Sequence, residues 1–260
     1  MDLKDRVALV TGVGRRAGIG AAIARELAGA RAKVFVSFLR RYDEAQTWGG
    51  DAAMPEALLQ ELRSHAEADG CELDLSDPTA PAALFAAARR RFGRVDILVN
   101  NAAHWEYGSI DRVDASQLDR HFAVNARAAV LLCAEFARHK VAGSPGRIVN
   151  ITSGQGLGPM PGELAYAVTK AALDVLTVSL SAELADRHIS VNAVDPGPTD
   201  TGWMTASVKA GLEAAASTGT VASPQDTARV VRALVSEAAA HVTGQIVRVR
   251  PGGTAVNGRA

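Results

Sequence analysis

Residues 6–20 read RVALVTGVGRRAGIG, and this stretch decides the fold of the chain. Its first part, Arg6–Thr11, is an apolar run of the kind that forms a strand covered on both faces. Closely spaced glycines follow, and Ile19–Arg31 then has the composition of a helix. In this order, glycines let a pyrophosphate approach backbone N–H groups at the helix N-terminus; a tight turn without a ligand is the alternative. The loop residues expected to contact a dinucleotide are Gly12, Gly14, Arg15, Arg16, Gly18, Ile19 and Gly20.

Short β-branched runs alternate with longer helical stretches along the rest of the chain, which is typical of parallel strands joined by crossover helices. The further predicted strands are Lys33–Phe38, Cys71–Asp74, Val95–Asn100, Arg147–Thr152, His188–Val194 and Gln245–Val249. The further predicted helices are Thr79–Phe92, Ala115–Lys140, Leu164–Arg187 and Pro224–Ala239, the last with Ser223 as its N-cap. This pattern predicts an α/β Rossmann fold, a doubly wound, seven-stranded parallel sheet flanked by helices.

No linker interrupts the alternation, so we expect a single domain over residues 1–260. Two stretches break the pattern, Arg41–Pro55 and Gly202–Ser223. The second follows the sixth strand, at the carboxyl edge where open α/β sheets bind ligands. Because long irregular segments in compact folds are usually functional, we interpret residues 202–223 as a substrate-loop insertion.

The charge balance argues against whole classes of partner. The chain has 28 Lys and Arg against 28 Asp and Glu, which removes the electrostatic basis for binding nucleic acid or a membrane surface. We find no run near the roughly 18 to 20 apolar residues of a membrane helix, and the charged N-terminus lacks a signal peptide's apolar segment. The two cysteines and six histidines show neither a disulfide framework nor metal-ligand spacing. We therefore expect a cytoplasmic protein without a catalytic metal.

The residues after the second predicted strand indicate which dinucleotide binds. A carboxylate at this strand end would accept hydrogen bonds from the ribose 2′-hydroxyl of NAD. The sequence instead has Arg40 and Arg41, with no acid before Asp43. With the two arginines of the glycine loop, they favour the 2′-phosphate of NADP, since a guanidinium can bind a phosphate through two N–H groups. We predict NADP(H) as the preferred cofactor, with NAD(H) as the alternative if some of these arginines are solvated surface residues.

Tyr166 and Lys170 lie four residues apart, so a helix places both side chains on one face. Tyrosine has an unperturbed pKa of about 10, and a neighbouring ammonium lowers that pKa by stabilising phenolate. Ser153 closes the fifth predicted strand and brings a hydroxyl to the same edge of the sheet. Each feature alone is common, but together with the glycine loop they predict an acid–base site acting on a carbonyl or alkoxide oxygen.

These motifs resemble those of the short-chain dehydrogenase/reductase family along essentially the whole chain, up to Thr243-Gly244-Gln245. The resemblance implies that Tyr166 exchanges the proton with substrate, beside Ser153, and that Lys170 binds the nicotinamide ribose and lowers the tyrosine pKa. It also implies that Asn125 holds a water in a proton relay. The further cofactor contacts that it implies are Asp74, Leu75, Asn101, Ala102, Pro196, Gly197, Thr199 and Thr201.

Three features depart from the family pattern. Five residues rather than three separate Gly12 from Gly18, so the arginine that meets the phosphate is left open. Ala103 replaces the usual glycine after Asn-Asn-Ala. Arg250–Gly253 lacks the acid that often precedes the last glycines of family members.

The motifs leave several functions to compare. Their layout is nearest to that of 3-oxoacyl-[acyl-carrier-protein] reductases, which implies an NADPH-dependent carbonyl reductase. A sugar, polyol or steroid dehydrogenase is the alternative enzyme, and a non-catalytic dinucleotide-binding regulator is the alternative outside the enzyme class. Enoyl reductases of the family typically place six residues between Tyr and Lys, whereas three separate Tyr166 from Lys170. The candidate substrate contacts are His104, Trp105, Gln155, Leu157, Met160, Glu163, Trp203 and Met204.

Two further predictions concern macromolecular partners. An acyl-carrier protein would meet a basic patch, with a solvated or subunit-facing surface as the alternative. The candidates for this patch are Arg127, Arg138, His139 and Lys140. The two longest predicted helices carry more apolar positions than one sheet face buries, and the family resemblance implies a homotetramer built on them.

Overall fold

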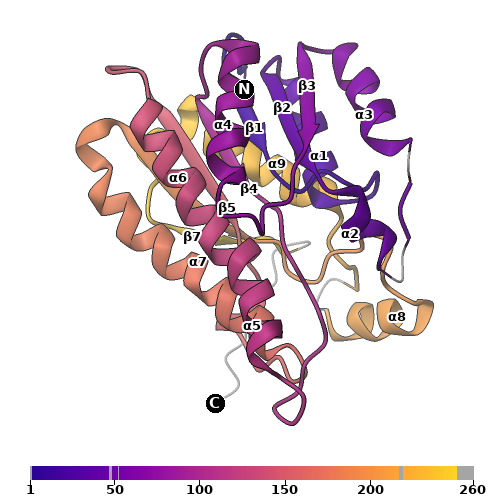
Figure 1. Ribbon diagram of the computed structural model, residues 1–260. Helices are drawn as coiled ribbons and strands as arrows, with labels where there is room; N and C mark the ends of the chain where they lie inside the picture. Colours follow the sequence, from indigo (N-terminus) through magenta and orange to yellow (C-terminus); the bar gives the residue numbers. More distant parts are fainter. Residues whose placement is uncertain (1, 47–48, 52, 217–218, 251–260) are drawn as a thin grey trace.

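Seven strands form one all-parallel sheet in the order β3-β2-β1-β4-β5-β6-β7 (Figure 1). This computed structural model describes residues 2–46, 49–51, 53–216 and 219–250. The order confirms the predicted Rossmann fold. The strands are β1 (Val7–Val10), β2 (Lys33–Phe38), β3 (Ala68–Glu72), β4 (Ile97–Asn100), β5 (Gly146–Ile151), β6 (Ile189–Asp195) and β7 (Ile246–Arg248).

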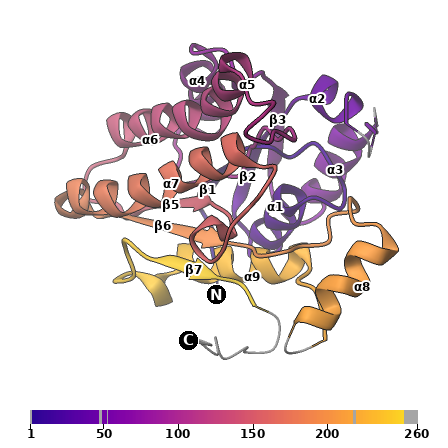
Figure 2. The same cartoon turned by 90° about the horizontal axis from the view of Figure 1, so that it is seen from below.

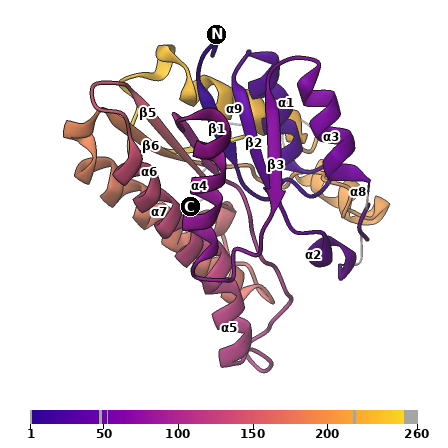
Figure 3. The ribbon, with the colours of Figure 1, turned by 45° about the horizontal axis from the view of Figure 1, so that its top comes forward.

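Helices cover both faces of the sheet (Figure 2). The first face carries α1 (Ile19–Gly29), α3 (Met54–Arg63) and α9 (Pro224–Val235), which share one apolar core with it. The opposite face carries α4 (Ala80–Phe92), α6 (Ala128–His139) and α7 (Leu164–Glu183), which share a second core (Figure 3). The sheet is therefore buried on both sides, as the continuous apolar runs of its strands require.

The carboxyl edge of the sheet is where ligands bind in this topology. The strand order reverses between β1 and β4, and open α/β sheets form a crevice at such a point. Three further helices lie beyond this edge: α2 (Arg40–Glu44), α5 (Ala115–His121) and α8 (Ala206–Ala215) (Figure 1). They enclose the space into which the loops after β1, β4, β5 and β6 project.

The structure corrects several predicted elements. β3 lies earlier than the predicted Cys71–Asp74, because its pairing with β2 runs from Ala68 opposite Val34 to Glu72 opposite Phe38. The stretch expected to be irregular after β2 contains α2, and α3 follows it with Pro55 in its first turn. Residues 202–223 contain α8 rather than a continuous irregular loop. Residues 47–48 and 52 of the stretch Arg41–Pro55, and residues 251–253 of Arg250–Gly253, lie outside the described residues.

The predicted helix Ala115–Lys140 is not continuous. It consists of α5, a π-helical turn at Phe122–Arg127, and α6, which ends at His139. By contrast, the predicted start of the last long helix is confirmed, since Ser223 caps α9 reciprocally with Asp226. Its end falls at Val235, before a short 3-10 turn at Glu237–Ala239.

Helix α7 corrects the expectation that no segment is apolar enough to cross a membrane. It is the one described helix that meets that criterion of length and composition, with a mean hydropathy of 1.3 over 18 residues. However, α7 packs along β6, with Ala165, Leu173 and Thr177 on its buried face. Its apolar character is that of a core helix.

Candidate active site

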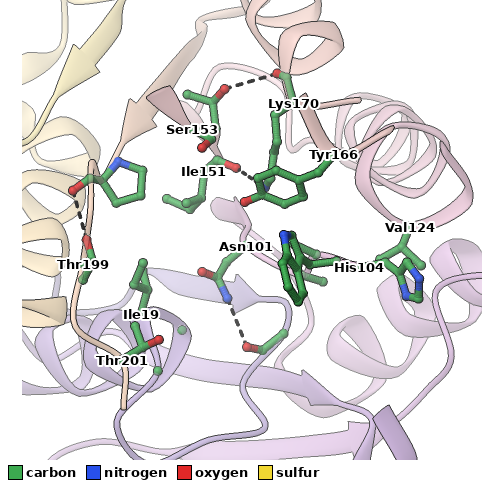
Figure 4. Close-up of a pocket in the computed structure, with 18 of the residues that line it drawn as sticks. Ile19, Asn101, His104, Val124, Ile151, Ser153, Tyr166, Lys170, Thr199 and Thr201 are labelled. Atoms are coloured by element: carbon green, nitrogen blue, oxygen red, sulfur yellow. Dashed lines mark hydrogen bonds between the residues drawn. The ribbon is translucent and has the colours of Figure 1, made fainter. Parts of the chain in front are cut away.

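A cleft of about 1140 Å³ runs along the carboxyl edge of the sheet, from the glycine loop to α7. Figure 4 shows Ser153, Tyr166 and Lys170 on one side of it, with Ile19 and Asn101 across from them. Most residues predicted to contact a dinucleotide line this single cleft. They are Gly12, Gly14, Arg15, Gly18, Ile19, Gly20, Asp74, Leu75, Asn101, Ala102, Tyr166, Lys170, Pro196, Gly197, Thr199 and Thr201.

The glycine loop is held tightly against the end of β4. Gly12 has a φ of +71°, and a Cβ added there would lie 2.5 Å from the Cα of Ala102, so glycine is required. The side-chain amide of Asn101 donates to the carbonyl oxygens of Thr11 (2.8 Å) and Gly12 (3.0 Å). Helix α1 then begins without a side-chain cap at Gly18, which leaves its first N–H groups open toward the cleft.

Arg16 and Arg40, both predicted cofactor contacts, do not line the cleft. Arg16 is 3.9 Å from Glu61 of α3, while Arg40 pairs with Glu56 and Glu72. Both guanidinium groups thus pair with carboxylates outside the cleft lining, and their contact with a cofactor stays a prediction.

Arg41, the next residue along the chain, does line the cleft. Its side chain is 71% exposed and pairs with Asp74, the predicted contact near the adenine. The sequence analysis assigned Arg40 and Arg41 the same role, but in the structure only the Arg41 side chain lines the cleft.

Arg15 spans the cleft entrance. Its guanidinium donates to the carbonyl oxygen (3.2 Å) and the hydroxyl (3.1 Å) of Thr201, and it lies 3.7 Å from the carboxylate of Asp43. Burial lowers the pKa of Arg15, whereas Asp43 raises it. Arg15 belongs to the glycine loop, which is two residues longer than the family pattern, so the longer loop reaches the segment that leads into α8.

The segment after β6 turns sharply at Gly197, whose φ is +62°. The Thr199 hydroxyl donates to the carbonyl oxygen of Pro196 at 3.0 Å. The residues of this turn line the cleft. The carboxylate of Asp195 accepts the N–H of Gly197 at 2.8 Å. This segment is therefore ordered by its own side chains.

Ser153, Tyr166 and Lys170 come together at the far end of the cleft, as the sequence predicts (Figure 4). The Ser153 and Tyr166 side chains both line this end of the cleft. The ammonium of Lys170 donates to the carbonyl oxygen of Ile151 at 2.8 Å and lies 5.6 Å from the centre of the Tyr166 ring. A carbonyl oxygen bound here would meet two hydroxyl groups.

Burial sets the protonation of this group. Burial raises the pKa of Tyr166, the charge of Glu163 raises it further, and the neighbouring Ser153 hydroxyl lowers it. The strongest influences on this pKa do not include Lys170, so the lowering of the tyrosine pKa by lysine stays a prediction. Burial also lowers the pKa of Lys170 to about 8, against the opposing effect of Asp174.

Asn125 lies behind the cleft rather than in its lining. It sits in the π-helical turn, fully buried, and its side-chain oxygen accepts the N–H of His104 at 2.6 Å. Its amide nitrogen donates to the carbonyl oxygen of His104 and the hydroxyl of Thr169, both at 3.0 Å. The side chain thus fixes the segment after β4 to α7, and its role in holding water stays a prediction.

The substrate side of the cleft is largely apolar. Of the predicted substrate contacts, Gln155 and Met204 do not line it. Those that do are His104, Trp105, Leu157, Met160, Glu163 and Trp203.

Sequence reasoning missed Tyr42, Asp43 and Arg120 as lining residues. The hydroxyl of Tyr42 accepts the N–H of Trp105 at 3.0 Å, and its ring lies 5.5 Å from that of His104. The position of Tyr42 and Asp43 just beyond the carboxyl end of β2 was a usable signal, because that edge binds ligands. Arg120 had no such signal, since α5 reaches the cleft only through the tertiary fold.

Each of the four basic residues considered for an acyl-carrier protein has a local partner, and the patch itself stays a prediction. Arg127 bonds the carbonyl oxygen of Ser76, and Arg138 pairs with Glu135. The ammonium of Lys140 bonds Ser144, and His139 stacks on Phe85 at 5.7 Å. Their side chains are thus engaged with different local partners.

Comparison of amino-acid sequences shows a family to which the chain is similar and several related proteins. Residues 12–254 match the family model described as Enoyl-(Acyl carrier protein) reductase. The chain is 41% identical to the uncharacterized oxidoreductase YjdA of Bacillus subtilis, over 96% of this chain and 97% of that protein. It is 33% identical to versicolorin reductase 1 of Aspergillus parasiticus (96% and 97% covered). It is 32% identical to the 3-oxoacyl-[acyl-carrier-protein] reductase FabG of Aquifex aeolicus (96% and 98% covered).

Solved structures agree with this similarity. A short-chain dehydrogenase/reductase from Serratia marcescens superposes with a TM-score of 0.85 at 31% identity, covering 96% of this chain and 98% of that one. A short chain dehydrogenase from Burkholderia cenocepacia, solved in complex with NADP, superposes with a TM-score of 0.86 at 30% identity and the same coverage. The fold, the cleft and these matches together establish that the chain belongs to the short-chain dehydrogenase/reductase family of oxidoreductases.

Proposed function

We propose that this protein is an NADP(H)-dependent carbonyl reductase that also oxidises the corresponding secondary alcohol. The observation that carries the proposal is that Ser153, Tyr166 and Lys170 line the same cleft as the glycine loop. Binding of a dinucleotide alone does not require such a group. The proposed catalytic residues are therefore Ser153, Tyr166 and Lys170, with Asn125 as the residue that supports a proton relay.

The cleft fits a nicotinamide dinucleotide. The glycine at position 12 cannot carry a side chain, and α1 presents uncapped N–H groups, which is the arrangement that binds a pyrophosphate. Asp74 and Leu75 would border the adenine, and Thr199 would face the nicotinamide carboxamide. When bound, the dinucleotide supplies the hydride for the carbonyl carbon.

NADP is the dinucleotide that we propose. Arg41 is exposed at the adenosine end of the cleft, where a 2′-phosphate could replace or join its present partner, Asp74. Arg15 is the second cation lining the cleft near the glycine loop. The NADP complex of the Burkholderia cenocepacia relative supports this assignment.

The protonation of Tyr166 favours the reductive direction. A tyrosine with the unperturbed pKa of about 10 is neutral near pH 7. Burial raises the pKa of Tyr166 further, so the phenol stays in the form that donates a proton. Reduction places the hydride on the carbonyl carbon and the Tyr166 proton on the carbonyl oxygen. Ser153 would hold that oxygen, and the ammonium of Lys170 would hold the nicotinamide ribose.

The substrate that we propose first is a 3-oxoacyl thioester. The similarity to the Aquifex aeolicus reductase supports it, and Leu157, Met160 and Trp203 would pack against an acyl chain. A polycyclic aromatic ketone is the second candidate, because the same apolar wall suits a flat ring system and a versicolorin reductase is among the relatives. Sugars and polyols fit this wall less well, since their hydroxyl groups would lose hydrogen bonds to water there.

We further propose that residues 1–260 act as one domain and assemble as a homotetramer. Strands β1 to β7 form one continuous sheet, and their loops meet in one cleft. Exposed apolar side chains on α5, the π-helical turn and α7 support the assembly. They are Leu118, Phe122, Val168, Val175 and Val178.

The decisive experiment is an initial-rate assay of NADPH oxidation with a short 3-oxoacyl thioester. Parallel reactions use NADH, a polycyclic aromatic ketone and an enoyl thioester, and Tyr166→Phe serves as the blank. We expect turnover with NADPH on a ketone substrate that disappears in the variant. Stoichiometric dinucleotide binding without turnover on any of these substrates, or on alcohols in the oxidative direction, would instead support a non-catalytic regulator.

A further inference from the structure

Asp174 lies one helical turn after Lys170 on α7, outside the group that would touch substrate. Its carboxylate accepts the Thr152 hydroxyl at 2.7 Å and the side-chain amide of Gln155 at 2.6 Å. The amide of Gln155 also donates to the Thr152 hydroxyl at 3.2 Å. The three side chains form a closed triangle of hydrogen bonds between α7 and the segment that leaves β5.

Along the chain, Ser153 lies between two members of this triangle, Thr152 and Gln155. Thr152 precedes it directly, and Gln155 follows it in a 3-10 turn at Gly154–Gly156. On its other side, the backbone N–H of Thr152 donates to the carbonyl oxygen of Val194 in β6 at 2.9 Å. The residues flanking Ser153 are therefore fixed at both ends.

We propose that Asp174 is a positioning residue that ties Thr152 and Gln155 to α7 and so holds the Ser153 hydroxyl against Tyr166 of the same helix. The proposal rests on the proposed function, in which that pair binds the substrate oxygen. Hydrogen bonds that fix the neighbours of a reacting group matter because a displacement of about 1 Å can lower the rate by about 10²-fold. Asp174 itself does not touch the substrate.

The charge of Asp174 has a separate effect, on Lys170. Three charged groups interact electrostatically with the Asp174 carboxylate. They are Lys170 on α7, Asp195 on β6 and Arg248 on β7. Asp174 raises the pKa of Lys170 against the effect of burial. Removing the charge therefore lowers the pKa of Lys170, so the ammonium is lost at lower pH.

Two variants separate the hydrogen bonds from the charge. The side-chain oxygen of Gln155 is buried without a hydrogen-bond partner, so Gln155 can rotate its amide to accept from an asparagine at position 174. Asp174→Asn therefore keeps hydrogen bonds from position 174 to both Thr152 and Gln155 and removes the charge, whereas Asp174→Ala removes both. Glu183→Ala, at the exposed end of α7, is the matched control.

The experiment measures kcat, KM, the pH profile of kcat/KM and the dinucleotide Kd by protein fluorescence. For Asp174→Ala we expect a fall in kcat of about 10²-fold, with the Kd for NADPH changed by less than about threefold because the glycine loop is untouched. For Asp174→Asn we expect kcat to recover to within about tenfold of the wild type, with the alkaline limb of kcat/KM moved to lower pH. Glu183→Ala should match the wild type in all four.

Wild-type kcat in Asp174→Ala would overturn the positioning role. An equal loss of kcat in the alanine and asparagine variants would also overturn it, because charge rather than hydrogen bonding would then be decisive. If the alanine variant fails to fold by circular dichroism, the asparagine variant carries the test through its kcat and pH profile. Tyr166→Phe, assayed in parallel with Asp174→Ala, distinguishes failure of the proposed function from failure of the positioning role. Turnover retained in Tyr166→Phe would contradict the proposed function itself.

Discussion

The ammonium of Lys170 lies 5.6 Å from the centre of the Tyr166 ring, and it donates to the backbone carbonyl of Ile151 rather than to a side chain. The lysine is therefore anchored to β5, independently of the tyrosine hydroxyl. Because both residues project from α7 over the end of β5, their spacing is set by the strand as much as by the helix. Reduction of a ketone would use this fixed spacing.

The anchoring of Lys170 predicts an alkaline limit to activity. Burial lowers its pKa to about 8, so a rising pH removes the ammonium proton near that value and removes the charge proposed to bind ribose. We expect kcat/KM for NADPH to fall as pH rises through about 8. A pH–rate profile checks this, and Lys170→Arg should move the limit upward because arginine stays charged. A flat profile up to pH of about 10 would contradict it.

Tyr166→Phe should abolish turnover while leaving the Kd for NADPH within about threefold, because the hydroxyl serves proton transfer more than binding. The loss expected from removing a general acid is at least about 10²-fold. Steady-state kinetics and fluorescence titration measure the two effects separately. Near-wild-type turnover would remove Tyr166 from its proposed role.

Arg41→Ala and Arg40→Ala form a matched pair, since the residues are adjacent but point to different surroundings. A charge-assisted hydrogen bond contributes about 1.5–3 kcal/mol. We therefore expect Arg41→Ala to weaken NADPH binding by about 10- to 100-fold while sparing NADH. Arg40→Ala should leave both Kd values close to the wild type, because its partners are Glu56 and Glu72. Equal effects of the two variants on NADPH would count against Arg41 as the phosphate contact.

Gly12→Ala should destabilise the fold and prevent dinucleotide binding. The backbone at Gly12 has a positive φ, and the added methyl would overlap Ala102. The conformational part alone costs about 1–2 kcal/mol. Gly29→Ala is the control, since its Cβ would meet nothing within 4 Å and alanine favours a helix by up to about 1 kcal/mol. Thermal denaturation should show Tm lowered in the first variant and unchanged or raised in the second.

Light scattering at micromolar concentration tests the homotetramer. Val175 is exposed on α7, on the same face as Val168 and Val178, and we expect Val175→Asp to reduce the mass by placing a charge in an apolar interface. Val208→Asp on α8 is the control, since this exposed valine lies away from that face. A monomer mass for the wild-type protein would rule out the assembly.

The sequence predicted the sheet and the acid–base group because their signals are local. The glycines after β1 and the four-residue spacing of Tyr166 and Lys170 each lie within one turn or one helix. The two arginines after β2 were harder, because α2 begins at Arg40. Successive residues of a helix point about 100° apart, so Arg40 meets Glu72 while Arg41 meets Asp74.

Other features depended on contacts between distant segments. β3 is set by pairing with β2, although Ala68, Asp69 and Gly70 have little strand propensity. The triangle around Ser153 joins α7 to the segment that follows β5, and no spacing along the chain relates Asp174 to Thr152. The helical signal of α3 was present, however, in the four-residue spacing of Met54, Leu58 and Leu62, all of which are buried.

The π-helical turn at Phe122–Arg127 makes the relative orientation of α5 and α6 depend on the number of residues between them. Each π-helical turn spans more residues than an α-helical turn, so the faces of α5 and α6 are out of phase with each other. Deleting one residue from this turn would restore a regular helix and rotate α5 against α6 by about 100°. Asn125 would then leave His104 and Thr169, even if every other residue of the two helices were retained. The number of residues in this turn thus sets the direction in which the Asn125 side chain points.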